Sequence, residues 1–385
     1  MVIRTFGWSF AVTAVGLAVA AYFWGATGFG IVLILSILEI SLSFDNAVVN
    51  ATILKKMNAF WQKMFLTVGI LIAVFGMRLV FPLLIVSLTA GMSPTDVVDL
   101  AFHENKMIDG MTYADHLDEA HPAIAAFGGL FLLMIFLDFM FDEEREHHWV
   151  GPLERFTGKL GNFDVLSTLI ALITLVVVAQ SLAPAHKEGT VMVAGVLGLI
   201  AYLAVGGLSD YFESHGTLGE INAEEDEDED AEEGAGAVQA ARSGPNTAQL
   251  AAGKAAFFMF LYLEVLDASF SFDGVVGAFA ITQDLLMITL GLGIGAMYIR
   301  SLTVYLVRQG TLDDYVYLEH GAMYAIGALA GILLASIKWE IHEVITGVVG
   351  VGFIGVALIS SIVRNKRIGH VPGQNGEAKT KAGVA

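Results

Sequence analysis

Long apolar stretches recur along the chain, and short polar segments separate them. A helix needs about 20 mostly apolar residues to cross the hydrocarbon core of a bilayer. Read at that length, the sequence predicts ten transmembrane helices, over residues 8–25, 29–52, 64–90, 123–141, 164–184, 190–209, 251–281, 285–307, 321–338 and 344–363. Because these segments are too long and continuous for barrel strands, we predict an all-α, polytopic membrane protein.

The composition agrees with a chain that lies mostly in lipid. Apolar residues make up 56% of the chain and charged residues 15%, whereas a typical soluble domain has about 25% charged residues. This excludes a soluble enzyme, and the net charge of −19 excludes ordinary electrostatic binding to nucleic acid. Because the chain has no cysteine, it has no disulfide or cysteine nucleophile, and a bound metal would take oxygen or imidazole ligands.

The basic residues outside the predicted helices gather on one side of the membrane. With ten helices the two termini share a side, which carries fifteen lysines and arginines against three on the other. The positive-inside rule then predicts that both termini are cytoplasmic and that the protein lies in the inner (plasma) membrane. For the first helix a signal peptide is the alternative, because Arg4 precedes an apolar run that contains Ala18-Val19-Ala20.

Two polar segments lie outside the predicted membrane helices. Residues 210–249 form a cytoplasmic linker whose core, Glu224–Glu233, is acidic at nine of ten positions. Because like charges repel and little apolar surface can be buried, we predict a disordered tether, with a cation buffer as the alternative. Residues 91–122 form an external loop rich in acidic and imidazole groups, which could attract a cation but show no fixed ligand spacing.

One motif occurs twice in the sequence. Leu38–Asn46 and Leu266–Gly274 are identical at five of nine positions, and a sixth position exchanges Glu for Asp. Each copy is followed by an arginine within a predicted helix, Arg78 or Arg300, and then by a histidine before a further helix, His121 or His320.

The two copies lie five predicted helices apart, so they run through the membrane in opposite directions. We therefore predict two inverted five-helix repeats, residues 1–184 and 190–363, followed by a cytoplasmic tail at 364–385. Secondary transporters share this architecture and bind substrate near the midplane, where the repeats meet.

Five carboxylates lie within the predicted membrane helices: Glu39, Asp45, Glu264, Asp267 and Asp273. An ionised carboxylate at the bilayer centre costs at least about 2.5–3.5 kcal/mol. Two buried arginines cannot neutralise five acids, so we expect a water-filled cavity or a cation at these groups. The alternative is a static network of the two arginines with two of the acids.

Helix geometry limits how these acids can meet one ion. Glu39 and Asp45 are six residues apart, so on one helix they differ by about 9 Å in height and about 120° in direction. Either the helices unwind within the motifs, at Ser43–Asn46 and Ser271–Gly274, or acids from the two halves pair across the protein. The second arrangement would place Glu39 with Asp273 and Asp45 with Asp267.

The two motifs resemble the signatures of a known family. Glu39-x-x-x-Ser43-x-Asp45-Asn46-Ala47 resembles the first signature of the TerC family of membrane proteins, in the LysE-like transporter group. Glu264-x-x-Asp267-x-x-Phe270-x-x-Asp273, with Ala278–Thr282 and the buried Arg300 after it, is similar to the second. The chain departs from the family pattern at Gly274, where a serine is usual, and at Val275-Val276-Gly277, which stands in place of an Ile-Pro pattern. It therefore resembles a divergent branch.

The resemblance covers roughly residues 29–90 and 260–330. It implies transport of a metal ion, chiefly export of Mn²⁺, and an association with tellurium resistance. The metal or proton ligands that it implies are Glu39, Asp45, Asp267 and Asp273, with Asn46 as a neutral ligand. Glu264 joins this predicted metal site as the remaining acid, and Arg78 and Arg300 are its predicted charge partners.

We therefore expect a transporter and not an enzyme, with lipid, metal ions and protons as its partners and no permanently bound cofactor. A membrane assembly protein of the TerC type, without transport, is the first alternative. An intramembrane aspartyl protease is the second, because two aspartates on separate helices could share a proton. Such a protease would carry Gly-x-Gly-Asp, whereas phenylalanine precedes both Asp45 and Asp273.

Overall fold

A computed structural model describes residues 2–103, 106–142, 145, 147–160, 165–207, 253–279, 281–282, 284–309 and 314–368. Within these ranges the side chains at 2–4, 41–42, 45, 255, 271–273, 276–277, 279, 308–309 and 343–344 are not described. The predicted linker at 210–249 and most of the predicted tail lie outside the described residues.

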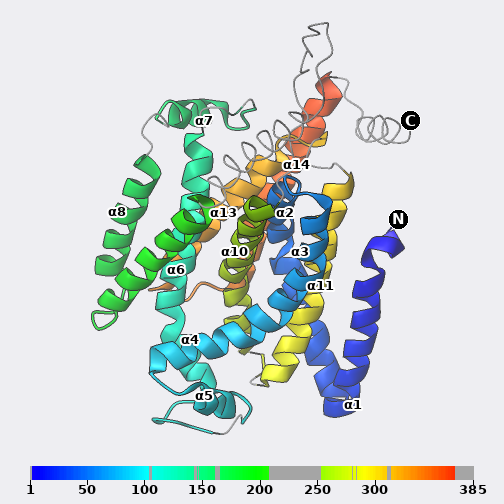
Figure 1. The fold of residues 1–385 in the computed structure, drawn as a ribbon, viewed down its shortest axis with the longest axis vertical. Coiled ribbons are helices and arrows are strands. Elements are labelled where there is room, and N and C mark those ends of the chain that lie inside the picture. The colour runs from blue at the N-terminus through cyan, green and yellow to red at the C-terminus, as the bar shows by residue number, and fades with distance from the viewer. Residues whose placement is uncertain are drawn as a thin grey trace, which may run out of the picture.

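All regular elements of the described residues are helices (Figure 1). They are α1 (Val2–Leu42), α2 (Phe44–Leu54), α3 (Ala59–Leu71), the π-helix η1 (Ile72–Val80), α4 (Phe81–Ala90), α5 (Pro94–Ala101), α6 (Tyr113–Phe141), α7 (Gly151–Gly158), α8 (Leu166–Ser181), α10 (Gly253–Phe279), α11 (Leu285–Gln309), α13 (Leu318–Ser336) and α14 (Glu343–Ile368). A further helix covers Glu188–Gly207. The all-α prediction is confirmed for this part of the chain.

Seven helices in the described part of the chain are long and apolar enough to cross a membrane. They are Thr5–Ile40, Ala59–Ala90, Tyr113–Phe141, Glu188–Gly207, Leu285–Val307, Leu318–Ser336 and Ile345–Ile368. The chain is thus of the multi-pass membrane type, although the predicted count of ten is not reached. One reason is that two predicted helices are not among the seven: α8, which is apolar but only 16 residues long, and α10, which lies in the segment predicted at 251–281.

A second reason is that the first two predicted helices are continuous in α1. Gly25 interrupts α1 with φ 67° and ψ −156°, a conformation that only glycine adopts readily. Figure 1 shows the two arms of α1, with the chain reversing between them. The predicted helices at 8–25 and 29–52 therefore correspond to these arms, with α2 continuing the second after a break.

The predicted external loop at 91–122 contains more helix than its polarity indicates. α5 lies within it, and α6 begins at Tyr113, ten residues before the predicted apolar segment. Thr112 caps α6 with its side chain, and Asp115 bonds back to the backbone N–H of Thr112, which together form a capping box. This cap starts the helix in polar sequence, where hydropathy gives no signal.

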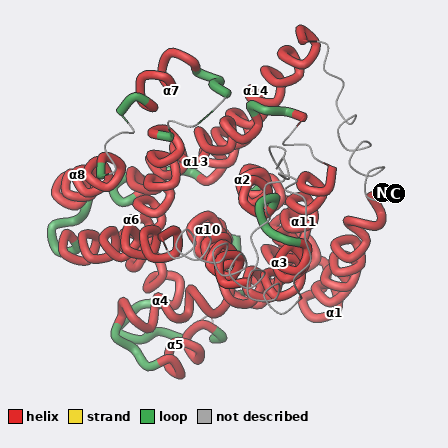
Figure 2. The backbone as a smooth tube through the Cα atoms, turned by 45° about the horizontal axis from the view of Figure 1, so that its top comes forward, coloured by secondary structure: helices red, strands yellow, loops and turns green. Residues whose placement is uncertain are grey.

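The helices form a bundle with α10 inside it. α10 contacts α2, α3, η1, α6 and α11, and α6 packs along α13 (Figure 2). The helix α7 and the end of α14 lie at one end of the bundle, and α5 lies at the other (Figure 1). The carboxylate-bearing helices α1, α2 and α10 contact one another inside this bundle.

Candidate functional site

The two copies of the repeated motif fold differently. Ser43 leaves helical geometry, with φ −99° and ψ 16°, and separates α1 from α2. This agrees with the expected interruption at the first motif. α10 instead continues as a helix through Ser271–Gly274, so the second motif does not unwind as that prediction required.

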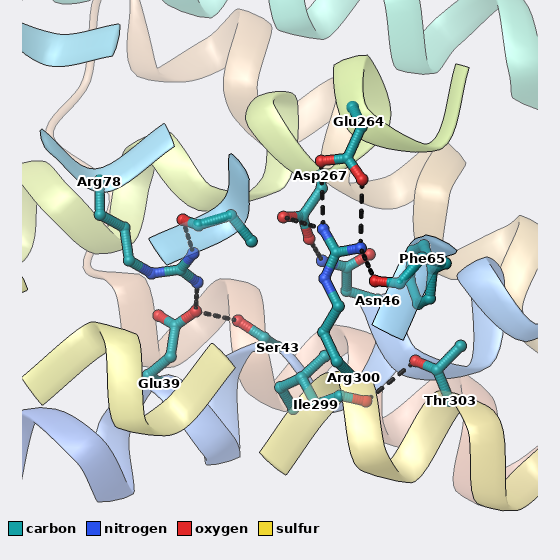
Figure 3. Close-up of polar contacts among 11 residues, drawn as sticks. Glu39, Ser43, Asn46, Phe65, Arg78, Glu264, Asp267, Ile299, Arg300 and Thr303 are labelled. Carbon is teal, nitrogen blue, oxygen red and sulfur yellow. Dashed lines mark hydrogen bonds and ion pairs between the residues drawn. The ribbon is translucent and has the colours of Figure 1, made fainter. Parts of the chain in front are cut away.

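The first charge centre joins Glu39 of α1 to Arg78 of η1 (Figure 3). Both residues are only 2% exposed. The Arg78 guanidinium donates to Glu39 Oε1 and, through Nη1, to the backbone oxygen of Ala73 at 2.6 Å. Ser43, at the helix break, donates its hydroxyl to the same carboxylate oxygen at 3.1 Å. The break and the π-helix thus both supply contacts to one buried ion pair.

The second charge centre surrounds Arg300 of α11 with acids from α10 (Figure 3). Nη1 and Nη2 bind the two carboxylate oxygens of Glu264, each at 3.2 Å. Nη2 also lies 3.3 Å from Asp267 Oδ2, and the guanidinium stacks 4.0 Å from the ring centroid of Phe65. A bidentate arginine pair of this kind fixes orientation as well as charge.

The first half of the chain contacts the second at equivalent motif positions. Asn46 of α2 donates its amide to Asp267 Oδ1 at 2.8 Å. Its counterpart in the second motif, Gly274, lies against Glu39, because a Cβ atom on this glycine would stand 3.2 Å from Glu39 Oε2. Position nine of each motif therefore meets the position-two acid of the other motif.

The chain matches a known protein family over most of its length. Residues 44–368 match the family described as "Protein of unknown function (DUF475)". The chain belongs to this family. Comparison with curated proteins and with solved structures gave no match. None of these comparisons names the TerC family, so the resemblance to it stays a prediction.

The DUF475 match divides the two charge centres. It contains Arg300, Glu264, Asp267 and Asn46, which together form the second centre. It begins five residues after Glu39, so α1 lies outside the match and the first centre is only partly inside it. All residues of the Arg300 centre therefore lie within the matched region, whereas Glu39 of the first centre does not.

The predicted metal ligands are only partly brought together. Asn46, Glu264 and Asp267 gather at Arg300, whereas Glu39 lies at Arg78. The side chains of the other two predicted ligands, Asp45 and Asp273, lie outside the described residues. Among the groups that are described, no three histidine or carboxylate side chains have an arrangement that could hold a metal ion.

Two features of the charge centres could not be predicted from the sequence. Phe65 contributes its ring to Arg300 and its backbone oxygen, which accepts from Nη1 at 3.4 Å. The π-helical turn that carries Arg78 has the same apolar character as the α-helices on either side. Phe65 is one of 25 phenylalanines, so its role is not distinguishable in the sequence. A change from α-helix to π-helix likewise leaves no distinct signal in the hydropathy.

The acids of the external segment pair with neighbours at the surface. Asp99 binds Lys106, and its Oδ1 lies 3.0 Å from His103 Nδ1. The hydrogen bond from Lys106 lowers the pKa of Asp99 below its usual value, because it favours the charged carboxylate. Glu104, in the same segment, lies outside the described residues. Asp99 and His103, two of the groups that were expected to attract a cation, thus have partners within the protein.

Proposed function

We propose that this protein is a membrane transporter that exports a divalent metal cation, with Mn²⁺ as the favoured ion. The observation that carries the proposal is an excess of buried negative charge. Glu39, Glu264 and Asp267 are buried together with only two guanidinium groups, those of Arg78 and Arg300. When all are ionised, these described groups carry three negative charges against two positive ones, because Arg300 is shared by two carboxylates.

The excess has a physical cost that a bound cation would remove. Breaking or leaving incomplete a buried ion pair is strongly unfavourable, because the unpaired charge has lost its water. Asp45 and Asp273 belong to the same two motifs, and their charges would raise the excess from one to three. Carboxylate and amide oxygens are ligands that Mn²⁺ accepts, and the resemblance to the TerC family favours this ion.

The proposal includes two inverted repeats that meet at the carboxylates. Its support is the reciprocal contact between the motifs, in which Asn46 meets Asp267 and Gly274 meets Glu39. Each arginine also binds the position-two acid of its own half, Arg78 with Glu39 and Arg300 with Asp267. A two-fold relation between the halves accounts for both sets of contacts at once.

The arginines then act as internal counter-ions in this mechanism. They hold the acids while no cation is present, and an arriving cation competes with the guanidinium groups for the same oxygens. Movement of the two halves relative to each other would expose the carboxylates to one side of the membrane at a time. With both termini cytoplasmic, export carries the ion towards the side of α5.

Transport by purified protein in proteoliposomes tests the proposal, with Mn²⁺, Ca²⁺, Mg²⁺ and H⁺ compared. Asp45→Asn and Asp273→Asn each keep the side-chain shape and remove one charge from an oxygen site that depends on charge count. We expect each substitution to abolish Mn²⁺ export at matched membrane amounts. Asp109→Asn is the control, because Asp109 is exposed outside the long apolar helices and asparagine tolerates its positive φ of 55°.

Normal export by both variants would refute the transport mechanism. In that outcome the carboxylates are dispensable for ion movement. Failure of the wild-type protein to export any of the four ions would instead favour a membrane assembly role without transport. Loss of export in the Asp109 variant as well would instead indicate a role of the external loop in attracting the cation, or a general effect of the substitution on folding or insertion.

A further inference from the structure

The short helix α7 is held against the bundle by one buried acid. Glu154 is 2% exposed, although it belongs to a helix at the end of the molecule. Its carboxylate accepts hydrogen bonds from the backbone N–H groups of Trp149 at 2.9 Å and Val150 at 3.2 Å, and from the Tyr324 hydroxyl at 3.1 Å. Tyr324 belongs to α13, so these bonds fix how α7 is rotated on the bundle.

The rotation leaves two chemically different faces of α7 exposed. Leu153 and Phe156, three residues apart, lie on one face and are 45% and 64% exposed. Arg155 and Lys159, four residues apart, lie on another face and are also exposed. Residues at these spacings share a helix surface. The helix therefore has a buried acidic face, an exposed apolar face and an exposed basic face.

The chain path puts α7 at a membrane surface. α6 ends at Phe141 and the apolar α8 begins at Leu166, so α7 connects two helices at the same end of the bundle. Figure 1 shows α7 lying across this end, transverse to α6 and α8. A helix in that position, with both apolar and basic faces exposed, has the composition of helices that lie in the plane of the bilayer interface.

We propose that α7 is an interfacial helix that binds the anionic phospholipid headgroups of the bilayer around the protein. Leu153 and Phe156 enter the boundary between headgroups and acyl chains, and Arg155 and Lys159 lie at the lipid phosphates. Charge complementarity selects this occupant, because juxtamembrane lysine and arginine side chains are attracted to anionic lipid surfaces. The inference does not depend on the transported ion or on transport itself.

Coupling to the bundle follows from the Glu154 contacts. The same helix that meets the lipid presents its carboxylate to Tyr324, and the Glu154 Oε2 lies 3.6 Å from His320 Nε2 on α13. α13 packs along α6. Glu154 therefore links the lipid-facing helix α7 to α13.

Site-directed fluorescence on the full chain tests the inference. Because the chain has no cysteine, Phe156→Cys introduces a single labelling site for an environment-sensitive dye such as NBD. The labelled protein is placed in vesicles of phosphatidylcholine, with or without phosphatidylglycerol. We expect quenching by doxyl-labelled lipid, and stronger quenching when phosphatidylglycerol is present. Replacing both Arg155→Gln and Lys159→Gln should reduce the quenching to the level of the neutral vesicles.

Two controls keep the outcome interpretable. Met107→Cys labels a residue of similar exposure, 61%, in the non-helical segment between α5 and α6. α5 lies at the opposite end of the bundle from α7 (Figure 1). Leu153→Cys repeats the measurement on the same face of α7 if the Phe156 variant does not fold. Quenching at position 156 by aqueous iodide, and not by doxyl lipid, would overturn the proposal. Equal lipid quenching in both vesicle types would also overturn it, because headgroup charge would then play no part.

Discussion

Removing Arg300 should destabilise the protein more than removing the acid that it binds. Arg300 lies between two carboxylates, with three N–O distances of 3.2–3.3 Å to Glu264 and Asp267. The variant Arg300→Gln leaves both acids buried without a positive partner. The variant Glu264→Gln leaves one acid and one guanidinium, which is a neutral pair.

The magnitudes follow from this count of charges. Breaking a buried pair by removing one partner costs about 3–5 kcal/mol, because a desolvated charge stays behind. Arg300→Gln should lie in this range, since it strands two charges. Glu264→Gln should cost about 1 kcal/mol, the net value of an ordinary hydrogen bond, because Asp267 still pairs with Arg300. The double variant should melt above Arg300→Gln alone, since it removes one of the stranded charges.

Thermal unfolding of the purified proteins in one detergent gives the order of melting temperatures. Arg367→Gln, at the exposed end of α14, is the matched control and should leave the melting temperature unchanged. The reasoning fails if Arg300→Gln melts with the wild type. It also fails if the double variant melts no higher than Arg300→Gln, because the coupling between the two sites would then be absent.

Two further predictions concern packing and the linker. Gly295→Ala should destabilise the protein by about 1–3 kcal/mol, because the added Cβ would lie 2.4 Å from Cβ and Cγ of Glu39. In the same thermal assay the control Gly352→Ala should be neutral or stabilising, because the space around Gly352 is open. Equal effects of the two substitutions would contradict the packing argument. Deleting Glu224–Glu233 should leave Mn²⁺ export in proteoliposomes largely intact, because this acidic stretch has little apolar surface to pack. A decrease in the export rate greater than about tenfold would instead indicate a sensor or buffer role for these acids.

The sequence located the apolar helices well because the length needed to cross a bilayer is a local property. The segment predicted at 285–307 lies in α11, and all but the last two residues of that at 321–338 lie in α13. The shape of α1 could not be predicted in the same way. Its reversal at Gly25 depends on packing of both arms on α11, and the polar start of α6 depends on a side-chain cap.

The repeated motif shows more clearly that local sequence alone does not determine the backbone conformation. Leu38–Asn46 and Leu266–Gly274 share five of nine residues, yet only the first contains a helix break. In the first copy the Ser43 hydroxyl binds Glu39, which Arg78 also binds. Tertiary contacts therefore decide between two backbone paths that the shared residues allow. The sequence named the acids and arginines, but which acid meets which arginine depends on how η1 and α11 pack.

The two halves of the chain differ in the number of acids near their motifs. Glu264 stands three residues before Asp267, and the equivalent position before Glu39 is Ser36, whose hydroxyl binds the backbone oxygen of Gly291 at 3.0 Å. The second half thus has one acid that the first half lacks, and the excess buried charge of the described residues belongs to it. In the transport mechanism proposed above, two identical inverted halves would present a cation with the same ligands from either side of the membrane. The additional acid removes that equivalence, so the carboxylate site is polarised towards α10 and α11 even though the two motifs are related.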